Sequence, residues 1–129
     1  MITDPISDLI IRIQNASRAK KSSVSLPYSN MKVAVAEVLE QEGYIGSIDK
    51  KAKKEGVLSL GLLYKNGAPV VNGVKRISKP SRRMYIGVHD IKPVKRGYGL
   101  VVLSTPAGIL SGKNAKAKNV GGEILFEIW

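Results

Sequence analysis

Hydrophobic residues in the first 67 positions follow a pattern that predicts two helices packed against a short β-sheet. Near the N-terminus they recur at helical spacing, at Ile6, Leu9, Ile10 and Ile13. Thr3 or Asp4 can cap this helix, and Pro5 suits its first turn. A second helix is expected over 30–42, because Ser29 can cap it and Gly43 can end it. Its inward-facing residues are expected to be Met31, Val35, Val38 and Leu39.

Three strands are expected in the same half of the chain. The stretch SSVSLPY (22–28) is typical of a short strand, in which Pro27 indicates an edge or an end. YIGSID (44–49) and GVLSLGLLY (56–64) are expected to pair antiparallel. The lysine-rich loop KKAKKE (50–55) that joins them is either solvated surface or a contact with phosphate.

The second half is expected to form a mostly β lobe with one short helix, which makes the whole fold α+β. KNGAPVVNG (65–73) is rich in turn residues, so we place the lobe boundary there and divide the chain into 1–67 and 68–129. Strands are expected at 74–78, 100–104 and 121–129, a charged turn at 79–85, an irregular connection at 88–99, and a helix at 111–118. In the last strand, Ile124, Phe126 and Ile128 are expected on one face.

The composition excludes several kinds of chemistry. The 129 residues include no cysteine, which removes disulfides, thiol catalysis and cysteine-ligated metals and favours a reducing compartment. His89 is the only histidine, so we expect no histidine metal site, no catalytic triad and no cofactor. The N-terminus carries acids where a signal peptide needs basic residues, and no apolar run approaches the roughly 20 residues of a membrane span. A cytoplasmic protein is expected.

The charge is strongly positive and unevenly distributed. The net charge is +11, which is typical of proteins that bind nucleic acids. Residues 1–67 hold 10 lysines and arginines against 7 acids, whereas residues 68–129 hold 11 against 3. A generally soluble basic surface would explain the total, but the excess in the second half favours a lobe that faces a polyanion.

Stretches that resemble catalytic or nucleotide sites are incomplete. GILSGKN (108–114) has three residues between its glycines, where a Walker A loop has four, and asparagine where that loop binds magnesium through Ser or Thr. Ser104 lacks the Gly-x-Ser-x-Gly turn of a hydrolase, and no acid is evident to orient His89. Glu123 and Glu127 are expected to share a strand face, and the solvent face of an edge strand explains them better than a catalytic pair does. We expect no enzyme.

Nucleic-acid binding fits the residues better, and RNA fits best. Basic side chains suited to a phosphate backbone cluster at Lys75, Arg76, Lys79, Arg82 and Arg83. Tyr85 follows directly and can stack on a splayed base, although it could also be a half-buried strand residue. Ser104 and Thr105 offer hydroxyls that suit 2′-hydroxyls and base edges, although they could also simply cap the strand. No helix is long and basic enough to read the major groove of DNA.

Two other functions remain open at this point. An enzyme that cleaves or modifies RNA would share the basic surface, but it would need a catalytic constellation that the residues do not provide. A non-specific DNA-binding protein would bind duplex DNA and RNA hairpins with similar affinity.

Five segments distributed along the whole chain carry a family resemblance: DPISDLIIRIQNA (4–16), LPYSNMKVAVAEVLEQEGYI (26–45), RISKPSRRMY (76–85), GYGLVVLSTPAGIL (97–110) and NVGGEILFEIW (119–129). In order and spacing, and essentially from end to end, the chain resembles bacterial small-subunit ribosomal protein S8. The resemblance implies a two-lobed α+β structural protein of the ribosome that binds 16S rRNA in its central domain and helps to assemble the platform. It also implies contacts with ribosomal proteins S5 and S12, and possible binding to the messenger of its own operon.

The resemblance also implies which residues contact RNA. Ser104, Thr105 and Gly108 match the Ser-Thr-Ser-Lys-Gly tip of the family, whereas Pro106 and Ala107 replace its second serine and its lysine. Basic residues expected to assist are Lys79, Arg82, Arg83 and Lys113, the last together with Lys116 and Lys118. Tyr85 and Glu123 match positions at or beside the RNA surface. In the first lobe the candidates are Thr3, Asp4, Arg12, Asn15, Ser29 and Lys32.

Overall fold

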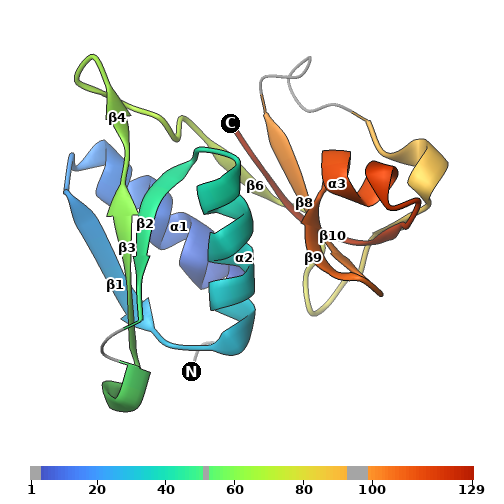
Figure 1. The fold of residues 1–129 in the computed structure, drawn as a ribbon, viewed down its shortest axis with the longest axis horizontal. Coiled ribbons are helices and arrows are strands. Elements are labelled where there is room, and N and C mark those ends of the chain that lie inside the picture. The colour runs from blue at the N-terminus through green and yellow to red at the C-terminus, as the bar shows by residue number, and fades with distance from the viewer. Residues whose placement is uncertain (1–3, 51–52, 93–98) are drawn as a thin grey trace. The chain divides into compact units, whose positions relative to one another are not determined.

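A computed structural model of the protein describes residues 4–50, 53–92 and 99–129 (Figure 1). These residues form two compact units, one spanning Pro5–Asn72 and the other Gly73–Trp129 together with Asp4. Each unit contains its own antiparallel sheet and at least one helix, so the predicted α+β fold is confirmed. We call them the N-terminal and the C-terminal unit.

The N-terminal unit is a three-stranded sheet covered by two helices. Its elements are α1 (Pro5–Arg18), β1 (Ser23–Pro27), α2 (Asn30–Gln41), β2 (Ile45–Asp49), η1 (Lys53–Glu55) and β3 (Val57–Leu62), followed by the short pair β4 (Tyr64–Lys65) and β5 (Ala68–Pro69). The strand order is β1-β3-β2, with β1 at an edge and ending at Pro27 as predicted. Alternate residues of β3 are buried against the helices, at Leu58, Leu60 and Leu62.

Helix α2 is confirmed, but the prediction that Met31 belongs to its inner face is wrong. Ser29 caps the helix by accepting a hydrogen bond from the Lys32 N–H at 3.1 Å. Met31 is 42% exposed, whereas the neighbouring Lys32 is buried. Periodicity alone could not predict that Lys32 is buried in place of Met31. The burial depends on the carboxylate of Asp8 on α1, which accepts a hydrogen bond from the Lys32 ammonium group.

The C-terminal unit is built around its last strand. Its elements are β6 (Val74–Arg76), β7 (Tyr85–Ile86), η2 (Val88–Asp90), β8 (Leu100–Thr105), β9 (Gly108–Ser111), α3 (Gly112–Ala117) and β10 (Gly122–Ile128). β10 pairs with β8 on one side and with β6 and β7 on the other, always antiparallel (Figure 1). Ser111 caps α3, and Ala115 packs with Ile91 and Leu103 on one face of the sheet.

The strand expected at 100–104 continues into a hairpin that the sequence pattern did not predict. β8 runs through Thr105, turns at Pro106 and Ala107, and returns as β9. β9 has only four residues, and a strand of that length shows no clear alternation of polar and apolar positions from which it could be predicted. The residues expected at a strand end therefore lie at the tip of a β-hairpin.

A β-bulge in β10 overturns two expectations about which side chains share a face. The register with β8 shifts between Ile124 and Phe126, so Leu125 is the extra residue. Ile124 consequently lies on the opposite face from Phe126 and Ile128. For the same reason Glu123 and Glu127 lie on opposite faces, and the paired-carboxylate interpretation is wrong.

Candidate nucleic-acid interface

Four strands of the C-terminal unit place a row of residues side by side on one face of the sheet. The register sets Tyr85 opposite Glu123, Glu123 opposite Ser104, and Ser104 opposite Ile109. Residues directly opposite each other in an antiparallel pair share a face and lie close together. Tyr85 is 71% exposed, while Glu123 and Ser104 are half-buried. We call Tyr85, Glu123, Ser104 and Ile109 the tip row.

Ser104 and Thr105 have different roles at the hairpin tip. Successive strand residues face opposite ways, so Thr105 does not belong to the tip row. Its hydroxyl group donates to the Gly108 carbonyl oxygen at 2.8 Å and accepts from the Ala107 N–H at 3.1 Å, which closes the turn. The hydroxyl group of Ser104 has no hydrogen-bond partner among the described residues, and it is therefore available to a ligand.

Two glycines near the tip meet different requirements. Gly108 has φ = +108°, a conformation that other residues adopt only with strain, and it allows the chain to leave the turn. Gly122 allows a close approach of two strands, because a Cβ atom there would lie 2.1 Å from the Ser104 carbonyl oxygen. Gly122, the first residue of β10, therefore permits the pairing that forms the tip row.

The carboxylate of Glu123 is held by two donors. Arg83 Nη1 donates to Glu123 Oε2 at 3.0 Å, and the Ser78 hydroxyl group donates to the same oxygen. Burial would raise the pKa of Glu123, but the hydrogen bonds from Ser78 and Arg83 and the charges of Arg83 and Arg76 outweigh burial and lower it. Glu123 is therefore ionised at neutral pH and accepts hydrogen bonds only.

The basic turn before β7 is a tight hairpin. Lys79 and Arg82 exchange two backbone hydrogen bonds, of 3.0 and 2.9 Å, across Pro80 and Ser81. The side chains of Lys79, Arg82 and Arg83 are exposed, so they can reach a phosphate backbone. The hairpin leads directly into Tyr85, which places these cations beside the tip row.

Two other cations predicted to bind RNA, Arg76 and Lys113, have internal partners or a different location. Arg76 forms two hydrogen bonds with the Asp4 carboxylate, at 3.0 and 3.2 Å, and another with the Leu125 carbonyl oxygen at the bulge. Arg76 thus stabilises the bulge. Lys113 is exposed on α3, which packs against the face of the sheet opposite the tip row.

Two candidates of the N-terminal unit, Arg12 and Lys32, bond to Asp8, whereas Asp4 belongs to the C-terminal unit and bonds to Arg76. Arg12 Nε donates to Asp8 at 2.8 Å, and Lys32 Nζ donates to Asp8 at 3.4 Å and to the Pro27 carbonyl oxygen at 3.2 Å. Asn15 is exposed on α1, and the hydroxyl group of Ser29 caps α2. Thr3 lies outside the described residues. The structure gives Arg12, Ser29 and Lys32 internal contacts, and their role in RNA binding stays a prediction.

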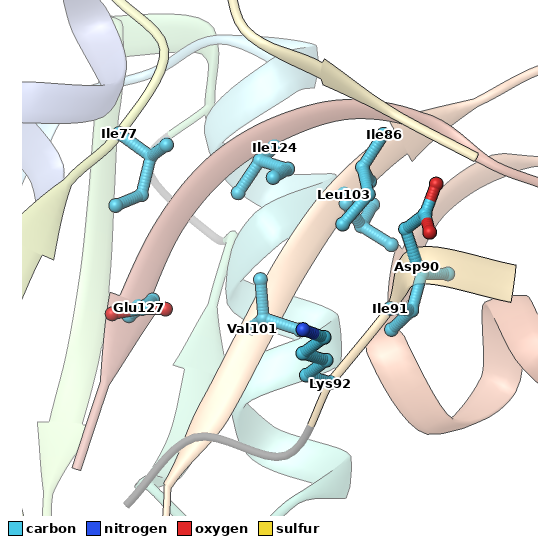
Figure 2. A pocket seen from close by; sticks show the side chains of 9 residues that line it. All are labelled: Ile77, Ile86, Asp90, Ile91, Lys92, Val101, Leu103, Ile124 and Glu127. Carbon is cyan, nitrogen blue, oxygen red and sulfur yellow. The ribbon is translucent and has the colours of Figure 1, made fainter. Parts of the chain in front are cut away.

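The face opposite the tip row contains a pocket of about 230 Å³ (Figure 2). Its apolar lining comes from Ile77, Ile86, Ile91, Val101, Leu103 and Ile124, and its polar lining from Asp90, Lys92 and Glu127. Among the described residues, the lining contains no serine, threonine, cysteine or histidine. Across the described ranges, no cluster of histidine, aspartate and glutamate suits a metal ion, and no helix is long and apolar enough to span a membrane.

Sequence reasoning missed two residues of this interface. Ile109 joins the tip row through β9, which was not predicted. Ser78 is fully buried and contacts a residue 45 positions away. Neither role has a local sequence signal, because both depend on strand pairing in the folded unit.

Comparison with known proteins identifies the family. Residues 4–129 match the family model for ribosomal protein S8. The small ribosomal subunit protein uS8 of Nitratidesulfovibrio vulgaris strain DP4 is 48% identical over 129 residues, and that of Oleidesulfovibrio alaskensis strain G20 is 50% identical, each alignment covering 100% of both chains. The uS8 protein of Lactobacillus delbrueckii subsp. bulgaricus is 44% identical over 100% of this chain and 99% of the relative. The chain therefore belongs to the ribosomal protein S8 family.

Proposed function

We propose that the protein is a structural constituent of the small ribosomal subunit that binds the central domain of 16S rRNA directly and helps to assemble the platform. Its family is structural and not enzymatic. The observation that carries the RNA-binding part is the tip row. It presents an aromatic ring, an ionised carboxylate and a hydroxyl group with no partner in the described part of the chain, beside an exposed basic hairpin.

Each group suits a different feature of structured RNA. The Tyr85 ring can stack on an unpaired base, and Ser104 can exchange hydrogen bonds with a 2′-hydroxyl or a base edge in a shallow minor groove. Ionised Glu123 can accept from a hydroxyl or amino group but repels phosphate. Lys79, Arg82 and Arg83 can hold the backbone on either side. We therefore assign the primary contact to the C-terminal unit.

Further contacts are proposed from the family resemblance. They are ribosomal proteins S5 and S12, the rRNA contacts of the N-terminal unit, and a site on the messenger of the protein's own operon. The contacts with S5 and S12 can be tested in small subunits assembled without one of these two proteins. The measurement is how much of the present protein then copurifies with the subunit.

Binding to RNA can be tested with the whole purified protein. A hairpin from the central domain of the cognate 16S rRNA would compete against a shuffled hairpin and a duplex DNA of equal length, at about 0.15 M salt, where the screening length is about 8 Å. A strong preference for the ribosomal hairpin is expected. Equal affinity for all three would leave only a basic surface and favour the non-specific DNA-binding alternative.

Removing the hydroxyl group of Ser104 should weaken specific binding. Ser104→Ala is expected to cost about 1–2 kcal/mol of binding free energy, the usual scale for a hydrogen bond, with little change in salt dependence. Isothermal titration against the ribosomal hairpin measures this. Ser25→Ala is the control, because that exposed serine lies on β1 of the N-terminal unit. Wild-type affinity in Ser104→Ala would exclude Ser104 from the contact.

Removing a phosphate-binding cation should instead change the salt dependence. Arg82→Ala is expected to reduce the slope of log affinity against log salt by about 0.7–0.9, which corresponds to one phosphate contact. Lys65→Ala removes an exposed cation from the N-terminal unit and should leave the slope unchanged. Equal slopes for Arg82→Ala and the wild type would show that Arg82 does not contact the backbone.

A further inference from the structure

Ser78 links the basic hairpin to the tip row through one buried hydroxyl group. The residue has no exposed surface. Its hydroxyl group donates to Glu123 Oε2 and accepts from the Met84 N–H at 3.1 Å. Its backbone N–H donates to the Ile124 carbonyl oxygen at 3.0 Å. Ser78 thus connects the beginning and the end of the hairpin segment with β10.

The hydrogen bonds at Glu123 use only one of its two oxygens. Ser78 and Arg83 both donate to Oε2, and no described residue donates to Oε1. A glutamate side chain has several rotatable bonds, and two donors on one oxygen restrict them. The carboxylate is thereby fixed with its second oxygen available as an acceptor beside Tyr85 and Ser104.

The two donors contribute differently to this arrangement. Arg83 carries a positive charge, and half of its side-chain surface is exposed, so RNA phosphate competes with Glu123 for its guanidinium group. Ser78 is neutral and fully buried, so RNA cannot compete for it. Its bond to Glu123 is the one that can persist when phosphate binds the hairpin.

We propose that Ser78 is a positioning residue for RNA recognition: its buried hydroxyl group fixes the Glu123 carboxylate so that Oε1 accepts a hydrogen bond from a hydroxyl or amino group of the RNA. This inference rests on the proposed function. The ionised carboxylate also repels phosphate at the position of Glu123 in the tip row. Ser78 therefore helps to keep the contact with an RNA base or sugar apart from the contacts with the RNA phosphate backbone.

Two charged groups act on Glu123 besides the neutral Ser78: Arg76 on β6 and Arg83 before β7. The residues opposite Glu123 on the neighbouring strands are Tyr85 on β7 and the uncharged Ser104 on β8. Arg76 and Arg83 remain when Ser78 is changed. A variant at Ser78 therefore reports on the hydroxyl group and not on the loss of a cation.

The protein-only test is the titration of Glu123 by NMR in full-length Ser78→Ala. The pKa of Glu123 is expected to rise towards its ordinary value, because a donor to the charged form is lost. Ser111→Ala is the matched control: Ser111 is equally buried in the same unit and accepts from the Asn114 N–H, yet it is not bonded to Glu123. An unchanged pKa in Ser78→Ala would overturn the proposal.

The wild type supplies a second measurement, in case Ser78→Ala does not fold. The Ser78 hydroxyl group bridges Glu123 and the Met84 N–H, so the Met84 amide resonance is expected to titrate together with the Glu123 carboxyl group. A Met84 resonance that stays constant while Glu123 titrates would contradict the bridge.

The RNA test separates this inference from the proposed function. Ser78→Ala is expected to bind the ribosomal hairpin about 3–10-fold more weakly than Ser111→Ala, on the scale of one hydrogen bond, with an unchanged salt slope. If the wild type binds the hairpin specifically and the two variants bind alike, the positioning role is wrong and the proposed function stands. If the wild type shows no specific binding, the proposed function itself fails, while the Glu123 titration still tests the bridge.

Modified hairpins identify the RNA group. One series would replace 2′-hydroxyls by hydrogen, and a second would use purines without the exocyclic amino group. The weakening caused by Ser78→Ala should disappear in the series that removes the donor to Glu123. Weakening that persists in both series would show that Ser78 acts on affinity by another route.

Discussion

A Gly122→Ala variant is expected to lose about 3 kcal/mol or more of folding free energy in the C-terminal unit, which lowers its melting temperature by about 10 °C or more. The new Cβ atom would lie 2.1 Å from the Ser104 carbonyl oxygen and 3.0 Å from the Thr105 Cα atom. Both neighbours belong to the backbone of β8, so no side-chain rotation relieves the clash. Either β10 or β8 must move, and the tip row opens with it.

A matched control for this variant is Gly87→Ala. Gly87 lies in the same unit with φ = −78°, and its nearest neighbour to a new Cβ atom would be Asp90 Oδ2 at an ordinary 3.6 Å. This change is expected to alter the free energy of unfolding by about 0.5 kcal/mol or less. Calorimetry of both variants, together with hairpin binding, measures the difference. Similar melting temperatures for Gly122→Ala and the wild type would mean that β10 and β8 do not approach each other closely enough at Gly122 to exclude a Cβ atom.

The alternation and periodicity of apolar residues were sufficient to predict most elements. β3 has buried leucines at every second position, and α1 has buried isoleucines and a leucine at helical spacing, because each of these elements buries one face. The bulge in β10 was not predictable, since Leu125 lies within an uninterrupted apolar run and has no feature that marks it as the extra residue. The position of the bulge is set by the pairing of β10 with β8 and by Arg76, which donates a hydrogen bond to the Leu125 carbonyl oxygen.

The candidate site was predicted as separate residues and not as an arrangement. Tyr85, Glu123 and Ser104 were each identified from residue type or from the family resemblance. Only the register of three strands shows that they are neighbours, because their separations along the chain are 19 and 38 residues. Thr105 looked equivalent to Ser104 in the sequence, and the hairpin turn makes it a structural residue.

The buried ammonium group of Lys32 makes Asp8 a sensitive position in the N-terminal unit. The Lys32 side chain is 4% exposed, and Asp8 supplies its only negative partner among the described residues. Asp8→Asn keeps the size of the side chain but leaves this charge unpaired. A loss of about 3 kcal/mol in the free energy of unfolding is therefore expected, at the low end for a broken buried pair because Asp8 is partly exposed.

A double-mutant cycle separates the ion pair from side-chain packing. Lys32→Met replaces the charged side chain with an apolar one of similar length, and it should restore most of the stability when combined with Asp8→Asn. Urea denaturation monitored on the N-terminal unit measures all four proteins. If the losses of the two single variants simply add, Asp8 and Lys32 are not coupled, and the buried ammonium group is stabilised by Pro27 alone.

The dependence of this pair on pH follows from the direction of the Asp8 pKa shift. Burial would raise the pKa of Asp8, but the hydrogen bonds and charges of Arg12 and Lys32 outweigh burial and lower it below 3.8. The stabilisation is therefore fully present above the ordinary pKa of about 4 and is lost as the pH falls through the lower folded value. The difference in unfolding free energy between wild type and Asp8→Asn should thus be constant near neutral pH and shrink below about pH 4. The other carboxylates titrate in both proteins and cancel in that difference, so a constant difference down to acid unfolding would show that Asp8 is not held in its charged form by the fold.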